Sequence, residues 1–280
     1  LLRQALERLA PDAQTTIRLS GCEPLLHPEL LSLVFTHVAK RGNPLRLTTN
    51  GLLLSPDWLT RFAKLPSLEL VVSVDGTAES QRAQRKTAYE ESDSYDWFHT
   101  LAPLLSRFPR PVTINLVVGP SEADKLAKNV AALFAKRLFR LNLLPAYYVP
   151  WSFTELRSLK RSFAQTSELI VGGLARSWPI TLVNLARHVR HPLFSDGLVL
   201  DVDGALYDNE LFMHRRLYPN RQDLAQGTLN EWPDLGPAPD WSATLAAHFP
   251  AELLAANAEA DAALSDFITA LAPWHERLRP

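Results

Sequence analysis

The chain has 280 residues, 46% hydrophobic content and a formal net charge of −1. This content is enough to bury one large core, and the nearly neutral charge argues against nucleic acid as a partner. No uninterrupted apolar run of about 18 residues occurs, so we expect no membrane-spanning helix and a soluble, cytoplasmic protein.

The sequence contains one cysteine, Cys22, and one methionine, Met213, and it begins with Leu1. A single thiol excludes a disulfide within the chain and any metal site that needs several thiolates from one chain. Because a natural open reading frame normally starts with Met, we expect this chain to be a processed or N-terminally truncated piece.

Helical and strand patterns alternate through the first half of the chain. Apolar residues at helical spacing predict helices at 1–9, 29–40, 55 onward, 95–108 and 122–137. Apolar and alternating runs predict strands at 17–19, 45–49, 68–74, 111–118 and 139–145. This alternation predicts an α/β fold with a parallel sheet inside its helices, which right-handed crossovers would curve into a barrel or part of one.

Glycines and polar residues follow three of the predicted strands at their carboxyl ends. The segments are Ser20-Gly21-Cys22-Glu23-Pro24, Thr49-Asn50-Gly51 and Ser73-Val74-Asp75-Gly76. Parallel α/β folds place their ligand sites at this edge of the sheet. The sequence therefore predicts a ligand site formed by these three segments.

The pattern changes after residue 150. A long helix is predicted over 153–176, a hairpin over 198–207 that turns at Asp203-Gly204, and Ala-rich helices over 242–277. We therefore expect two parts, a (β/α) domain over 1–150 and a C-terminal α+β extension over 151–280.

The three strand-end segments resemble motifs of the radical S-adenosylmethionine (radical SAM) superfamily. In chain order they are similar to its Gly-Gly-Glu-Pro, Thr-Asn-Gly and Ser-x-Asp-Gly motifs. The resemblance implies a partial (β/α) barrel, whose first strand and following loop are missing from this chain. The later segments 203–207 and 227–229 resemble the SPASM or twitch extension of the peptide-modifying members, without its cluster cysteines.

The resemblance implies a role for each strand-end residue. Glu23, with the backbone of Gly21 and Cys22, would bind the methionine amino group of S-adenosylmethionine, since a carboxylate pairs well with an ammonium. A Glu23 that caps a turn is the alternative. The Cys22 side chain is interpreted as a small buried residue that points away from the ligand.

Ser73 and Asp75 would contact the ribose or carboxylate of the same cofactor. Thr49 and Asn50 are candidates for cofactor contacts in the same way. Solvated strand ends, and a simple turn at Asn50-Gly51, are the alternatives. Asn115 lies in an otherwise apolar strand, where it faces the ligand or satisfies the backbone.

Asn142, Arg85 and the histidines are the other residues considered for a role in the site. Asn142 has the same two interpretations as Asn115. Arg85 could meet a carboxylate, although we interpret it as part of a solvated helix face. The eight histidines show no metal-ligand spacing, so no metal site is predicted, and the catalytic residues stay unknown.

The family reaction is reductive cleavage of S-adenosylmethionine to a 5′-deoxyadenosyl radical that acts on a peptide or small-molecule substrate. The reaction needs a 4Fe–4S cluster held by a Cys-x3-Cys-x2-Cys loop, and this chain lacks that loop. We therefore expect the cluster ligands to lie upstream of Leu1, so that the chain as given is inactive.

Two alternatives stay open. The chain could be a degenerate, non-catalytic relative that binds a peptide or a nucleoside ligand. It could also be an unrelated (β/α) barrel, for which a closed eight-stranded barrel would be diagnostic.

Overall fold

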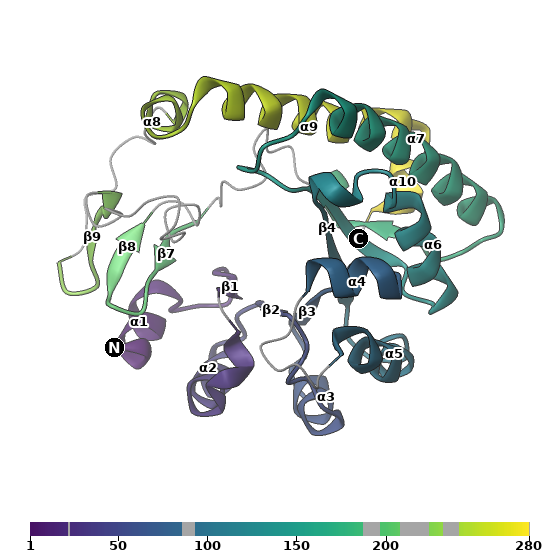
Figure 1. The fold of residues 1–280 in the computed structure, drawn as a ribbon. Helices are drawn as coiled ribbons and strands as arrows, with labels where there is room; N and C mark the ends of the chain where they lie inside the picture. Colours follow the sequence, from purple (N-terminus) through teal and green to yellow (C-terminus); the bar gives the residue numbers. More distant parts are fainter. Residues whose placement is uncertain (22, 86–92, 187–196, 208–223, 232–240, 280) are drawn as a thin grey trace.

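The computed structural model describes residues 1–21, 23–85, 93–186, 197–207, 224–231 and 241–279, which form a mixed α/β fold (Figure 1). Within them, six parallel strands form one sheet in the order β1-β2-β3-β4-β5-β6. The strands are β1 (Ile17–Leu19), β2 (Leu45–Thr49), β3 (Leu68–Ser73), β4 (Val112–Val118), β5 (Arg140–Pro145) and β6 (Thr181–Leu182). The predicted α/β fold class, a partial parallel (β/α) barrel, is confirmed as an open six-stranded parallel sheet.

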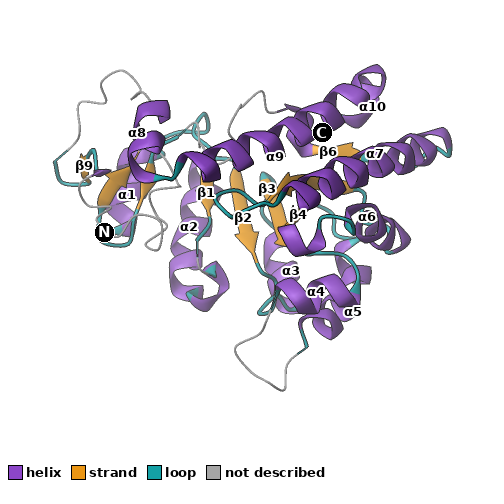
Figure 2. Cartoon of the chain, turned by 45° about the horizontal axis from the view of Figure 1, so that its top comes forward, coloured by secondary structure: helices purple, strands orange, loops and turns teal. Residues whose placement is uncertain are grey.

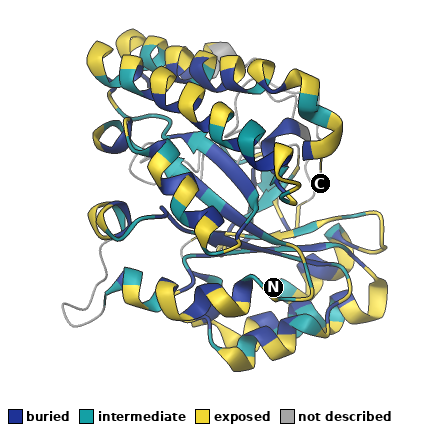
Figure 3. Cartoon of the chain, turned by 90° about the vertical axis from the view of Figure 1, so that its right-hand side faces the viewer, coloured by how far each residue is buried: buried dark blue, intermediate teal, exposed yellow. Residues whose placement is uncertain are grey.

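The outer face of this sheet is apolar and carries the helices. Leu47, Leu70, Ile114 and Leu141 are fully buried, because alternate side chains of each strand point to one face. The helices that lie along the sheet are α1 (Leu2–Leu9), α2 (Pro28–Arg41), α3 (Pro56–Ala63), α5 (Ser94–Leu105), α6 (Leu126–Ala135) and α7 (Phe153–Ala175). Figure 3 shows their exposed sides turned to solvent and the strands buried behind them.

Several helix starts follow from local capping chemistry. Ser55 Oγ accepts a hydrogen bond from the Trp58 amide at the start of α3. Ser152 and Glu155 form a complete capping box at the start of α7. These caps satisfy amide groups that have no partner inside the helix, and so define where each helix begins.

Two elements of the parallel unit were not predicted. Helix α4 (Ala78–Gln84) lies in the polar stretch after β3, and β6 extends the sheet beyond residue 150. The division at residue 150 stays a prediction, although β6 and α7 both belong to the helix–strand alternation of the sheet.

The last two α-helices contact the β5–β6 end of the large sheet. Helix α9 (Ala251–Ala270) packs along α7, as Figures 1 and 2 show, and Phe267 stacks near Phe163 with ring centroids 5.0 Å apart. Helix α8 (Trp241–His248) precedes it, and the short α10 (His275–Leu278) follows it.

A second, antiparallel sheet confirms the predicted hairpin. Strands β7 (Val199–Leu200) and β8 (Ala205–Tyr207) pair around Gly204, and β9 (Gly227–Thr228) pairs with β8. Helix α1 meets this sheet, because Arg8 Nη1 donates a hydrogen bond of 2.7 Å to the Leu229 carbonyl. Among the described helices, none is long and apolar enough to cross a membrane.

Candidate functional site

Glu23 connects the carboxyl ends of β1 and β2. Its carboxylate is buried, and Oε1 accepts hydrogen bonds from the Leu25 amide at 3.1 Å and from Thr49 Oγ1 at 2.8 Å. Its Oε2 accepts one from the Asn50 amide at 2.8 Å. The turn-capping interpretation of Glu23 is confirmed, since it caps the short helix at 24–26. Oε2 keeps acceptor capacity for a ligand, because each carboxylate oxygen accepts about two hydrogen bonds.

The turn after β2 is fixed by side chains and by one glycine. Thr49 Oγ1 accepts a hydrogen bond from the Gly51 amide, and Asn50 Oδ1 accepts one from the Leu52 amide, both at 2.9 Å. Gly51 has a φ of +81°, and a Cβ there would lie 2.1 Å from the Trp97 ring. Only glycine fits this position, so the Asn50-Gly51 turn presents its amide to Glu23 in one geometry.

Ser73, Asn115 and Asn142 lie next to one another on β3, β4 and β5. Ser73 pairs with Asn115 in the sheet register, and Asn115 pairs with Asn142. Asn142 Nδ2 donates a hydrogen bond of 2.7 Å to Asn115 Oδ1. Ser73 Oγ has no hydrogen-bond partner among the described residues, so its hydroxyl is available to a ligand.

Asp75 lies just beyond β3 and is paired with Arg85. The carboxylate is 1% exposed, with Arg85 Nε 2.6 Å from Oδ2 and Nη2 3.1 Å from Oδ1. The Asp75 amide donates to Gln81 Oε1 at 2.8 Å. The interpretation of Arg85 as part of a solvated helix face is therefore wrong: it follows α4 and turns inward, because a buried carboxylate requires a cation.

Burial shifts the pKa of Asp75. Loss of water raises the pKa of this carboxyl, the ion pair with Arg85 lowers it, and the nearby Glu122 carboxylate raises it again. The net shift is upward. The ion pair with Arg85 thus offsets only part of the cost of burying the Asp75 carboxylate. A cationic or hydrogen-bonding ligand beside Asp75 would stabilise its ionised form.

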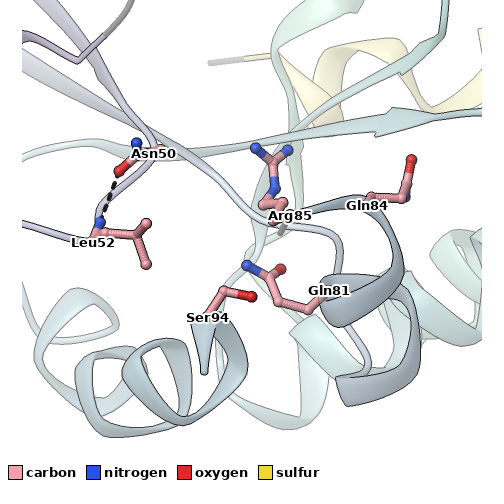
Figure 4. Close-up of a pocket in the computed structure, with 6 residues that line it drawn as sticks. All are labelled: Asn50, Leu52, Gln81, Gln84, Arg85 and Ser94. Carbon is pink, nitrogen blue, oxygen red and sulfur yellow. Dashed lines mark hydrogen bonds between the residues drawn. The ribbon is translucent and has the colours of Figure 1, made fainter. Parts of the chain in front are cut away.

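A pocket of about 180 Å³ opens beside these groups, between the turn after β2 and the amino end of α5 (Figure 4). Its lining residues are Asn50, Leu52, Gln81, Gln84, Arg85 and Ser94. Most of them carry amide, hydroxyl or guanidinium groups, so the pocket suits a small polar ligand. Gln81 and Gln84 were not predicted as site residues, and Thr77, which caps α4, is the sequence signal that could have found that helix.

The predicted site residues fall into one connected group. Glu23, Thr49 and Asn50 are joined directly, and Asn50 lines the pocket with Arg85, which binds Asp75. Ser73 lies two residues before Asp75, at the end of β3, and is the register partner of Asn115 on β4. Gly21 has a φ of +85°, as a sharp turn before Glu23 requires, whereas Cys22 lies outside the described residues.

These residues fit the polar parts of S-adenosylmethionine but not an iron–sulfur cluster. A carboxylate with an unused acceptor, a free hydroxyl and side-chain amides match an ammonium, a carboxylate and ribose hydroxyls. A 4Fe–4S cluster of this kind needs three thiolates, and the sequence has one cysteine.

Comparison with known proteins agrees with the geometry. The family model described as Radical SAM superfamily matches residues 1–134. Curated protein sequences give no match.

Similar solved structures include "Native anSMEcpe with bound AdoMet", with a TM-score of 0.68, 15% identity and coverage of 83% of this chain and 69% of that chain. "Native anSMEcpe with bound AdoMet and Cp18Cys peptide" has a TM-score of 0.66, 14% identity and coverage of 83% and 70%. "Streptococcus suis SuiB bound to S-adenosylmethionine" has a TM-score of 0.59, 13% identity and coverage of 83% and 57%. The chain thus spans about two thirds of the anSMEcpe chains and less of SuiB, and at these identities the likeness concerns the fold alone.

Proposed function

We propose, from the premise that residues 1–134 form a radical SAM superfamily domain, that this chain binds S-adenosylmethionine at the carboxyl ends of β1 to β4. The observation that supports the proposal is the Glu23 carboxylate, which Thr49 and the Asn50 amide hold at the junction of two strand ends. A buried carboxylate with an open acceptor position is suited to an ammonium ligand.

Each remaining residue has a part in this proposal. Glu23 and the backbone at Gly21 receive the ammonium group, with Cys22 contributing backbone alone. Ser73, Asn115 and Asp75 face the ribose hydroxyls and the cofactor carboxylate as donors and acceptors. Thr49 and Asn50 act as positioning residues, because their hydrogen bonds orient Glu23.

The finer proposal is a radical SAM-type enzyme of the SPASM or twitch kind that acts on a peptide. Bound to a reduced 4Fe–4S cluster, S-adenosylmethionine supplies a 5′-deoxyadenosyl radical in this family. Because the residues given hold one thiol, an active enzyme would take its three cluster thiolates from residues outside this sequence. The peptide is supported by structures with this fold, whose titles name bound Cp18Cys and Kp18Cys peptides.

The second candidate is a non-catalytic scaffold that binds a peptide or a nucleoside ligand. The single cysteine favours it, because the auxiliary cluster cysteines of the extension are absent together with those of the main cluster. Both candidates use the same mouth of the sheet, so cofactor binding alone does not separate them.

Calorimetric titration of the purified chain with S-adenosylmethionine tests the shared proposal. We expect Glu23→Gln to weaken binding about 10- to 100-fold, since a hydrogen bond to a charged group contributes about 1.5–3 kcal/mol. Glu29→Gln is the matched control, because Glu29 is an exposed carboxylate on α2, and its replacement should leave the affinity unchanged.

Ser73→Ala provides a second variant, because it removes a hydroxyl that has no described partner and so leaves the fold intact. We expect it to weaken binding about threefold to tenfold. Equal affinities for the wild type, Glu23→Gln and Ser73→Ala would contradict the proposed site.

Iron content separates the two candidates. The full product of the natural gene is reconstituted anaerobically with iron and sulfide, and its iron is compared with that of the 280-residue chain. About four iron atoms in the full product alone support the enzyme. A full product that binds S-adenosylmethionine and takes up no iron supports the scaffold.

A further inference from the structure

Basic residues gather where the chain enters the strands of the large sheet. Because its six described strands are parallel, the chain enters each of them at the same end, opposite the strand ends that carry the candidate site. We call this end the amino-end face and define it by the helix ends and connections before β2 to β6, which are residues 40–44, 64–67, 106–111, 136–139 and 176–180. These ranges contain no acidic residue and eight basic ones: Lys40, Arg41, Lys64, Arg107, Arg110, Lys136, Arg137 and Arg176.

The opposite end of the sheet has the reverse charge. The connections after β1 to β5 contain four acidic residues, Glu23, Asp75, Glu122 and Asp124, and one basic residue, Lys125. The whole chain has a net charge of −1. The positive charge of the amino-end face therefore results from the segregation of charges between the two ends of the sheet, and not from a basic composition.

Contacts between neighbouring connections join them into one surface. Ser67 Oγ donates a hydrogen bond of 2.9 Å to the Asn43 carbonyl, and Arg110 Nη2 donates one of 3.1 Å to the Ala63 carbonyl. The register of β5 with β4 and with β6 places the last two connections beside these. Since adjacent strands lie about 4.8 Å apart, the five connections form a surface about 20 Å long.

The positive charge of this face is not neutralised within the described part of the chain. None of the eight basic side chains forms an ion pair with a described residue, and all except Arg110 and Lys136 are exposed. Five helices, α2, α3, α5, α6 and α7, end here, and each helix dipole contributes about −0.5 charge. The dipoles together offset about 2.5 of the eight positive charges, so helix capping accounts for only part of the cluster.

The other side chains of the amino-end face favour a protein partner over a membrane or a nucleic acid. Among the large apolar side chains that are exposed in the described residues, only Leu104 lies near this face, whereas stable membrane attachment needs inserted apolar groups as well as basic charge. Phe108, Phe139 and Trp178 are half-buried, whereas single-stranded nucleic acid binds by stacking its bases on accessible aromatic rings.

We infer that the amino-end face binds an acidic segment of a protein partner, in which several Asp or Glu residues follow one another along an extended chain. Guanidinium groups pair well with carboxylates, and arginine is enriched at protein interfaces. About six extended residues span the 20 Å of the face, so each connection can meet a different carboxylate. The inference does not depend on the proposed function, because β4, with seven residues, separates this face from the candidate site by about 20 Å.

Binding of a capped decapeptide of alternating Glu and Gly, labelled with a neutral dye, tests this face by fluorescence anisotropy. A second decapeptide carries Gln in place of every Glu. We expect the Glu peptide to bind the wild-type protein about tenfold more tightly at low ionic strength. This advantage should shrink as salt is raised, because exposed charges are screened.

A triple variant removes part of the positive charge. Arg41→Gln, Lys64→Gln and Arg107→Gln are combined, because these side chains are exposed and lie on three adjacent connections. We expect the Glu peptide to bind this variant about fivefold more weakly. None of the three side chains has an ion pair among the described residues, so the variant should fold normally, which its melting temperature checks.

A matched triple variant controls for net charge. Arg3→Gln, Arg157→Gln and Arg161→Gln remove the same three charges from exposed positions in the first halves of α1 and α7, away from the amino-end face. This variant should bind the Glu peptide as the wild type does. Equal losses in the two triple variants would overturn the docking face, as would equal binding of the two peptides or no binding of either.

Two further probes test the class of partner. Phosphatidylserine vesicles and oligouridine are titrated under the same conditions, and tighter binding of either than of the Glu peptide would overturn the assignment to a protein. The Glu peptide should leave the affinity for S-adenosylmethionine unchanged, because the two sites lie at opposite ends of the sheet. Competition between them would overturn the placement of the peptide, whereas absence of cofactor binding with the peptide result intact would contradict only the proposed function.

Discussion

At the scale of single residues, Asp75 and Glu69 are partly compensated carboxylates of the same strand region with opposite pKa shifts. Burial raises the pKa of Asp75 by more than the ion pair with Arg85 lowers it. Thr113, Arg46 and Arg140 together lower the pKa of Glu69 despite its burial. The two residues should therefore make the stability depend on pH in opposite senses.

The pH prediction follows from these signs. A raised pKa in the folded state means that the native protein binds more protons than the unfolded chain above pH 3.8, so Asp75 reduces stability as pH rises through that window. Asp75→Asn should therefore make the change in unfolding free energy from pH 4 to 7 more positive. Urea unfolding at both pH values measures it.

Glu69 gives the opposite control. Its lowered pKa contributes stability that is complete above pH 4.5 and is lost as pH falls below it, so Glu69→Gln should flatten the acid side of the curve. Shifts of the same sign for both variants would contradict the assignment.

Glycine geometry gives a second prediction at this scale. Gly76 has a φ of +96°, and a Cβ there would lie 2.6 Å from the Asn129 carbonyl oxygen, whereas Gly21 has a φ of +85° with nothing within 4 Å. Gly21→Ala should cost only the left-handed strain, about 1–2 kcal/mol. Gly76→Ala adds a backbone clash and should cost about 1–3 kcal/mol more. Chemical denaturation compares them, and equal losses would contradict the clash.

At the scale of elements, sequence periodicity located the five longer strands and most helices, because their apolar residues repeat at helical or strand spacing. It missed β6, which has two residues, and α4, whose sequence Ala-Glu-Ser-Gln-Arg-Ala-Gln has no apolar stripe. Strand β6 forms by pairing with β5, and the local signal for α4 is its cap at Thr77, which periodicity does not register. Without α4, the sequence could not place Arg85 beside Asp75, and this is why Arg85 was misassigned.

The packing of α9 on α7 predicts which phenylalanine contributes to the stability of the fold. Phe267 is 2% exposed against Phe163, so Phe267→Ala should lower the unfolding free energy by about 3–5 kcal/mol. Phe153 begins α7 but is 75% exposed, and Phe153→Ala should change stability by less than about 0.5 kcal/mol. Thermal denaturation of both variants makes the comparison. A similar loss in the two would show that α9 is not held by this contact.

At the scale of the whole molecule, the sequence predicted which residues form the candidate site but not which of them contact one another. Three short motifs gave Glu23, Asn50 and Asp75, since parallel strands bring their carboxyl ends together. The hydrogen-bonded group of Glu69, Thr113 and Arg140 was missed, although charged residues inside apolar strands are a usable signal for an inward-facing polar group. Its assembly depends on strand register, which single strands do not specify.

The contact between α1 and the β7–β9 sheet gives the prediction at this scale. Arg8→Ala removes the hydrogen bond to Leu229, and should speed amide exchange in 199–207 about fivefold while leaving β3 unchanged. Arg3→Ala, an exposed neighbour on α1, should have no effect in the same mass-spectrometric measurement. Equal exchange in both variants would show that Arg8 does not hold the two parts together.

The strand order of the large sheet has a consequence for how the protein is made. Each described strand after β1 is hydrogen-bonded to the strand that precedes it along the chain, so no strand must insert between two partners that are already paired. Every new helix–strand unit can join an existing edge as soon as it has left the ribosome. The sheet can therefore assemble during translation, in the order of synthesis, without waiting for the C-terminus.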